Sequence, residues 1–156
     1  MPSRRELIRM TPDEERSYLE TQRRIILVTV GPGGMPHPVP MNYGLDAEGR
    51  IVITSFRKSQ KVRNLERDPR ATLLVESGET YAELRSVIAY CQAEILTEPE
   101  AVAAGMSLVQ AAQQLAGSIG ESMEEQVRAS LAKRVILRFT PFRTVSWDHA
   151  KLAGYY

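Results

Sequence analysis

Basic side chains are concentrated in residues 57–68, a segment that the sequence predicts to be a short helix. Arg57, Lys58 and Lys61 lie in its first half, and two acids lie at its end. This order opposes the helix dipole, which favours acids in the first turn and bases in the last by about 0.3–1 kcal/mol each. The order becomes favourable when an anion such as phosphate occupies the helix N-terminus. The segment therefore indicates a phosphate site, with a solvated basic face as the alternative.

An apolar strand is expected directly before this helix, over residues 50–55. The strand ends in the hydroxyl pair Thr54-Ser55, and Asp68-Pro69 disfavours further helical turns beyond the basic segment. Strand and helix together bring hydroxyl groups, cations and free helix N–H groups to one point.

A second strand, expected over residues 37–45, carries prolines at positions 36, 38 and 40. Successive residues of a strand direct their N–H groups to opposite sides, so the three missing donors fall on one edge. That edge must face solvent, a bulge or a ligand, because it cannot pair normally with another strand.

The remaining segments indicate strands joined mostly by hairpins and interrupted by helices. Thr11-Pro12-Asp13-Glu14 is a capping box that predicts a helix start. About six strands without regular alternation with helices favour a mainly β fold, an antiparallel barrel with peripheral helices, over a doubly wound sheet. The other expected elements are strands at 24–30, 71–76, 84–96 and 134–139, helices at 11–20, 98–115 and 121–133, a turn at 31–34 and a break at 117–120.

Length and composition indicate a single domain over residues 1–156, with residues 1–10 as a flexible arm. The net charge of +1 argues against broad electrostatic binding to nucleic acid. The single cysteine, Cys91, excludes an intrachain disulfide framework and is expected to be buried. Residues 1–10 lack the apolar core of a signal peptide, and no stretch has the roughly 18 apolar residues that a membrane span needs. We therefore expect a soluble, cytoplasmic protein with no membrane contact.

The chain resembles the flavin- and deazaflavin-binding split barrels related to pyridoxamine phosphate oxidase. The similarity covers about residues 23–98 and lies in Thr54-Ser55, in residues 59–65 and in Asp68-Pro69-Arg70-Ala71 with the strand that follows. Residues 84–87, Leu-Arg-Ser-Val, resemble the next cofactor-lining strand. The resemblance implies a split β-barrel that binds its cofactor in a groove along the barrel wall.

The resemblance also implies individual roles. The cofactor phosphate is expected at Lys61 and Ser59, with Arg57 or Lys58, and Ser86 matches a polar side chain that reaches the ring edge or the tail. Apart from the resemblance, the large aromatic side chain of Trp147 is expected either to cover the bound ring or substrate or to pack in a dimer interface. The backbone groups expected to bond the ring edge belong to Val39, Pro40, Met41, Thr54 and Ser55.

Residues 146–156 differ from the substrate-binding tail of pyridoxamine phosphate oxidase, so oxidation of a vitamin precursor is not expected. The chain is closer to the smaller members that use the deazaflavin coenzyme F-420. The resemblance thus implies a homodimeric oxidoreductase that uses coenzyme F-420, or FMN, to transfer a hydride to an unsaturated or quinone-like small molecule. No catalytic side chain is assigned, since the cofactor carries the chemistry. The alternative is a non-catalytic protein that binds or senses flavin or haem.

Other kinds of site have weaker support. His37 and His149 are the only histidines, and no Cys/His cluster has metal-ligand spacing, so no metal is expected. Asp148-His149 offers half of a catalytic triad, but no serine nucleophile on a sharp turn is recognisable. A third hypothesis is a barrel that binds nucleic acid through the basic helix. The scarcity of aromatic residues beside that helix argues against it.

Overall fold

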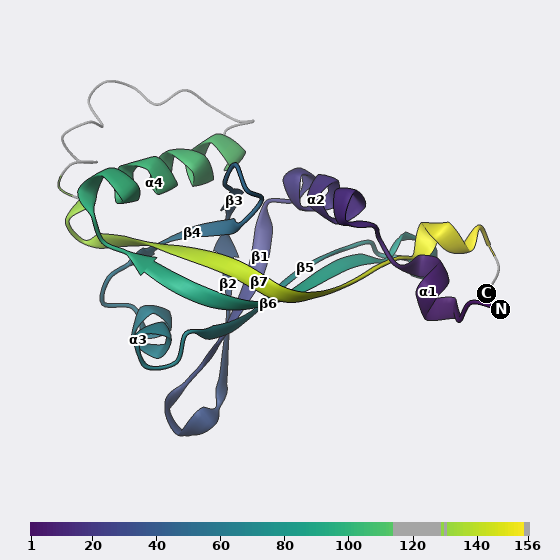
Figure 1. Ribbon diagram of the computed structural model, residues 1–156, viewed down its shortest axis with the longest axis horizontal. Coiled ribbons are helices and arrows are strands. Elements are labelled where there is room, and N and C mark those ends of the chain that lie inside the picture. Colours follow the sequence, from purple (N-terminus) through teal and green to yellow (C-terminus); the bar gives the residue numbers. More distant parts are fainter. Residues whose placement is uncertain (114–128, 130, 155–156) are drawn as a thin grey trace.

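The computed structural model describes residues 1–113, 129 and 131–154. One antiparallel sheet of seven strands organises this part of the chain, in the order β2-β1-β5-β6-β7-β4-β3 (Figure 1). The helices are α1 (Arg4–Ile8), α2 (Pro12–Thr21), α3 (Gln60–Arg67) and α4 (Pro99–Gln113), with short 3-10 turns η1 (Pro32–Gly34), η2 (Tyr81–Glu83) and η4 (His149–Leu152). The strands are β1 (Arg24–Val30), β2 (Pro36–Asn42), β3 (Gly44–Leu45), β4 (Ile51–Phe56), β5 (Arg70–Ser77), β6 (Arg85–Leu96) and β7 (Arg134–Asp148).

The expected mainly β fold with peripheral helices is confirmed, and the sheet curls into a half-barrel. The strand expected over residues 37–45 divides into β2 and β3 at Tyr43, which gives seven strands where about six were expected. Tyr43 is buried, and its hydroxyl donates to the carbonyl of Leu19 at the end of α2. A tertiary contact therefore divides this strand, and local sequence gives no sign of it.

The prediction for the proline-rich edge is confirmed. In the part of the chain that the structure describes, β2 is the terminal strand of the sheet and pairs with β1 alone. Its three prolines are exposed, whereas the alternating residues His37, Val39 and Met41 are half-buried. Because prolines cannot donate to a neighbour, the outer edge of β2 cannot extend the sheet.

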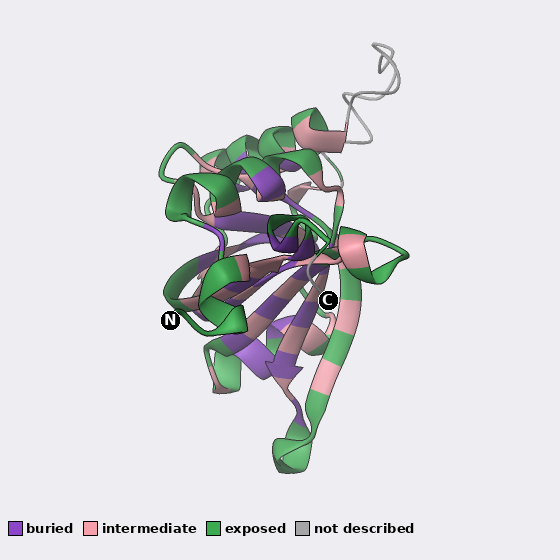
Figure 2. Cartoon of the chain, turned by 90° about the vertical axis from the view of Figure 1, so that its right-hand side faces the viewer, coloured by how far each residue is buried: buried purple, intermediate pink, exposed green. Residues whose placement is uncertain are grey.

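Two apolar clusters lie on opposite faces of the sheet. The larger fills the concave side and includes Leu27, Leu73 and Phe139, all of which are fully buried. The smaller lies beneath α4, where Val102 and Val109 pack against Val52 and Ile136. Purple and pink alternate along the strands in Figure 2, as expected for strands whose residues face the core and the outer surface in turn.

Helix α2 begins with the expected capping box, in which Thr11 and Glu14 bond each other's backbone N–H groups. Residues 1–10, expected to be a flexible arm, contain the capped helix α1, and Met10 is buried. The helix expected at 121–133 and the break at 117–120 lie almost entirely outside the described residues. Among the helices that the structure describes, none has the length and hydropathy of a membrane span.

Candidate cofactor site

The basic segment forms a turn followed by α3, and the helix begins later than expected. Ser59 is the N-cap residue, so Arg57 and Lys58 lie in the turn before the helix and not in its first turn. The Ser59 hydroxyl does not cap the helix, because it lies 2.9 Å from the hydroxyl of Ser55 at the end of β4. The first N–H groups of α3 have no intrahelical acceptor, so this end of the helix is suited to an anion.

The charges at the other end of α3 differ in part from the expectation. Arg67 lies in the last turn, where a base is favourable, and Asp68 is the C-cap residue. Asp68 pairs with Arg70 at 2.7 Å, and hydrogen bonds from Arg70 lower the pKa of the Asp68 carboxyl to about 2. The reversal relative to the dipole is therefore confined to the N-terminal half of the segment.

Lys61 is the most informative charged group of this region. Its side chain is half-buried, and burial lowers the pKa of the ammonium. Among the described residues it has no ion-pair or hydrogen-bond partner. A partly desolvated cation without a partner is less favourable than one in water, and an anion beside it would offset that cost.

Helix α3 is fixed on the sheet by Asn64, a fully buried residue. The Asn64 amide donates to the Thr29 hydroxyl of β1 at 2.9 Å and accepts from the Gln60 side chain at 2.7 Å. Arg67 bonds the Val30 carbonyl at 2.6 Å, and Val62 and Leu65 enter the core. These contacts hold the N-terminus of α3, and with it Lys61, in a defined position.

The two free ends of the curled sheet meet beside this helix. β2 closes one end of the strand order, β4 and the short β3 close the other, and β2 contacts β4. β4 pairs with β7 on one side, while on its other side β3 covers only Ile51 and Val52. The residues along this seam include the expected ring-binding segments 39–41 and 54–55, next to Ser59 and Lys61.

Ser86 and Trp147, which were also expected to bind the cofactor, lie far from the seam and from Lys61. They pair with each other at the start of β6 and the end of β7. Thr54 of β4 pairs with Ile136 of β7, and Ile136 pairs in turn with Leu96 of β6. Leu96 is at the opposite end of the 12-residue β6 from Ser86. At about 3.3 Å per residue, the separation along the strand is roughly 30 Å. Ser86 is also buried, and its hydroxyl donates to the Val75 carbonyl at 2.9 Å.

The other candidate groups have structural partners. Asp148 lies 3.3 Å from Arg85 and caps η4, while the His149 ring contacts Tyr81 and places Nδ1 2.7 Å from its carbonyl. Burial raises the pKa of the Cys91 thiol to about 12, as befits an apolar core residue. Across the described ranges, no group of three or more His, Cys, Asp or Glu side chains is suited to a metal ion.

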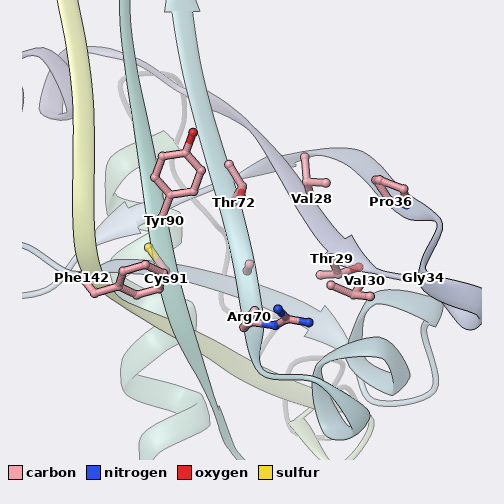
Figure 3. A pocket seen from close by; sticks show the side chains of 11 residues that line it. Val28, Thr29, Val30, Gly34, Pro36, Arg70, Thr72, Tyr90, Cys91 and Phe142 are labelled. Atoms are coloured by element: carbon pink, nitrogen blue, oxygen red, sulfur yellow. The ribbon is translucent and has the colours of Figure 1, made fainter.

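The outer side of β1, β5 and β6 contains a groove of about 460 Å³. Tyr90 and Phe142 line one side of it and Val28 and Pro36 the other, with Arg70 at its lower end (Figure 3). None of the residues expected from the sequence to bind a cofactor lines this groove.

Fold and site together define a class: an antiparallel half-barrel whose seam ends at the N-terminus of a basic helix. The chain belongs to the pyridoxamine 5'-phosphate oxidase family, whose sequence profile matches residues 11–148. This match confirms the family that the sequence resembles.

Solved structures agree with this assignment. A conserved hypothetical protein from Mycobacterium tuberculosis is 37% identical, with a TM-score of 0.87 over 97% of this chain and 93% of that one. A protein described as an F420 reductase is 25% identical, with a TM-score of 0.64 over 83% and 94%. A heme binding protein from Mycobacterium smegmatis, 19% identical with a TM-score of 0.62 over 98% and 61%, shares the fold. No curated protein matches the sequence.

Sequence reasoning missed the anchoring role of Asn64. The available signal was an amide residue between Val62 and Leu65, the two core positions of a short helix, because a polar side chain at such a position needs a buried partner.

We predict that Asn64→Ala destabilises the protein by about 1–3 kcal/mol, because the buried Thr29 hydroxyl loses its partner. Urea unfolding measures the effect. Gln60→Ala is the matched control, since it removes an exposed member of the same network and should cost less than about 1 kcal/mol. Equal costs for the two variants would show that Asn64 does not anchor α3.

Proposed function

We propose that the protein is an oxidoreductase that binds a phosphate-bearing deazaflavin, coenzyme F-420, or FMN, in the seam between β2 and β4. The observation that carries this proposal is the half-buried, unpartnered Lys61 ammonium at the N-terminus of α3. Family membership supports it, because flavin and deazaflavin cofactors are typical of this family.

The residues of this region fit a phosphate group. Lys61 supplies the charge, the first N–H groups of α3 supply donors, and the Ser59 hydroxyl lies at the same end of the helix. Arg57 and Lys58 are exposed in the preceding turn and add positive charge. The cofactor supplies the hydride that goes to an unsaturated or quinone-like acceptor.

The contribution of the chain is therefore binding and orientation. Within the described residues the outer edge of β2 has no strand partner, so its carbonyl groups are open to a ligand ring. On the other side of the seam, β4 beyond Val52 has a second unpaired edge, where Thr54 is half-buried. No side chain is assigned a proton-transfer role.

Lys61→Ala should weaken cofactor binding by about 1.5–3 kcal/mol, roughly ten- to a hundredfold, because it removes a charged hydrogen-bond donor. Fluorescence titration of the folded variant measures this. Arg16→Ala, which removes an exposed cation from α2, is the matched control and should leave the affinity unchanged. An unaltered dissociation constant for Lys61→Ala would refute the phosphate site.

Coenzyme F-420 should bind more tightly than FMN, and its binding should weaken more steeply with salt. The acidic tail extends past the phosphate and needs further cations, which Arg57, Lys58 and Arg63 supply from exposed positions. The similarity to an F420 reductase supports this choice. Titration of both cofactors at two ionic strengths tests it, and tighter binding of FMN would assign the protein to the flavin instead.

A homodimer would bring the two separated sets of expected cofactor residues closer, because one protomer's half-buried Trp147, next to the buried Ser86, would approach its partner's seam. An apolar row on the outer face supports such an interface. Its members pair across four strands and are half-buried, namely Ile26, Leu74, Ile88 and Val145.

Light scattering at micromolar concentration should therefore give twice the 17.5 kDa chain mass. Leu74→Lys places a charge in the middle of the row and should yield monomers with weakened cofactor binding. Gln92→Lys, at an exposed position on β6, is the control and should remain dimeric. A wild-type monomer that binds cofactor tightly would contradict the shared site.

A binding or sensing role without turnover is the alternative function, and the fold shared with a heme binding protein is consistent with it. Incubation of the protein with reduced cofactor and a quinone separates the two. Steady oxidation of the cofactor indicates an enzyme, whereas a single stoichiometric change indicates a binding protein.

A further inference from the structure

A second basic region lies at the opposite end of the molecule from α3, where α1 packs beside the end of β7 (Figure 1). Between them is a groove of about 450 Å³. Arg5 and Arg9 line it from the α1 side, and Arg143 lines it from β7. We call this the arginine groove; Ser3, Glu6, Thr144, Val145 and Ser146 complete its lining.

The three arginines have no acidic partner among the described residues. Arg143 lies 5.6 Å from the ring centre of Tyr90, which orients the guanidinium and leaves its N–H groups available. The side chains of Arg5 and Arg9 make neither a hydrogen bond nor an ion pair with the part of the chain that the structure describes.

The acids near the arginine groove accept hydrogen bonds from groups other than the three arginines. Glu6 accepts bonds from the backbone and hydroxyl of Ser3, at 2.6 and 2.8 Å. Glu14 caps α2 and pairs with Lys151, at 2.5 Å. Glu15 accepts from the hydroxyl of Ser146 at 2.7 Å and contacts that of Thr144 at 3.3 Å. The lining holds three arginines against one carboxylate, Glu6, so the arginine groove keeps a surplus of positive charge.

The strand that forms one wall has a free edge. β4 pairs with β7 only as far as Phe139, so from Thr140 onward β6 is the only strand that pairs with β7 in the described structure. Backbone groups on the outer edge of residues 143–146 consequently add donors and acceptors to the groove. Half-buried Val145 adds an apolar surface.

We propose that the arginine groove binds a small organic molecule that carries two or more carboxylates. Arginine binds carboxylates through paired N–H donors, and cations on two walls suit a ligand with separated negative groups better than one compact ion. The volume of about 450 Å³ is in the range of small-molecule sites and much larger than a single inorganic anion needs. This inference goes beyond the proposed cofactor site. None of the residues around α3 and β4 lines the arginine groove, and Val145 is the one lining residue that also belongs to the apolar row of the proposed dimer.

Calorimetric titration of the full-length protein with citrate, triglutamate and inorganic phosphate tests the proposal. Trp147, the only tryptophan of the sequence, follows the groove residue Ser146 and provides a fluorescence signal for the same titrations. We expect citrate or triglutamate to bind at least tenfold more tightly than phosphate, with an affinity that falls as salt rises. Tighter binding of triglutamate would indicate that the natural ligand carries its carboxylates on a peptide-like chain. Tighter binding of citrate would indicate a compact acid.

Arg5→Gln, Arg9→Gln and Arg143→Gln should each weaken the tighter ligand at least threefold, and the triple variant should abolish binding. All three positions are exposed, so the variants should fold, which circular dichroism checks. Arg24→Gln, an exposed arginine at the start of β1, is the matched control and should change the affinity less than twofold.

Unchanged affinity in the triple variant, an equal loss in Arg24→Gln, or preferential binding of phosphate would overturn the proposal, as would the absence of binding at millimolar concentration. Lys61→Ala should leave citrate and triglutamate binding intact. Failure of the arginine groove and failure of the proposed cofactor site are therefore separate results.

Discussion

The edge of β2 that cannot pair is the constraint on which the rest of the structure depends. Three alternate prolines remove three successive donors from one side of this strand, so the sheet cannot add a regularly paired strand there. The curled sheet consequently ends at a seam between β2 and β4. β4 leads directly into the turn before α3, so the seam and the helix N-terminus are neighbours because of chain connectivity.

The position of the α3 N-terminus beside the seam depends on the contacts that hold this helix on the sheet. A helix of 8 residues is marginal alone, so its position must come from tertiary contacts. Val62 and Leu65 supply apolar burial, and Asn64 adds a directional bond to β1. The hydroxyl of Ser59 is held by Ser55, which leaves the first N–H groups of α3 uncapped.

Local sequence predicted most elements because their signals are local. The capping box at Thr11 and the hairpin at residues 31–34 lie where they were expected. Tyr43 divides a strand through a contact with α2, an effect that has no local signal. β7 continues to Asp148 past a bulge at Phe142, which lies between the pairs Cys91–Pro141 and Tyr90–Arg143. Sequence similarity indicated roles for the residues around Lys61 and for Ser86 alike. It could not indicate that the two groups lie near opposite ends of β6, because a motif does not specify the distance between its residues in the fold.

The position of the Lys61 ammonium is not one that folding alone favours. Folding alone favours pairing or exposing a lysine, yet this ammonium is half-buried without a partner. Asp68 pairs with Arg70 and Glu66 is exposed, so the acids of the same segment do not neutralise it. An anion bound as proposed above would lie beside both this ammonium and the uncapped helix N–H groups, and it would supply the interaction that the fold leaves unsatisfied.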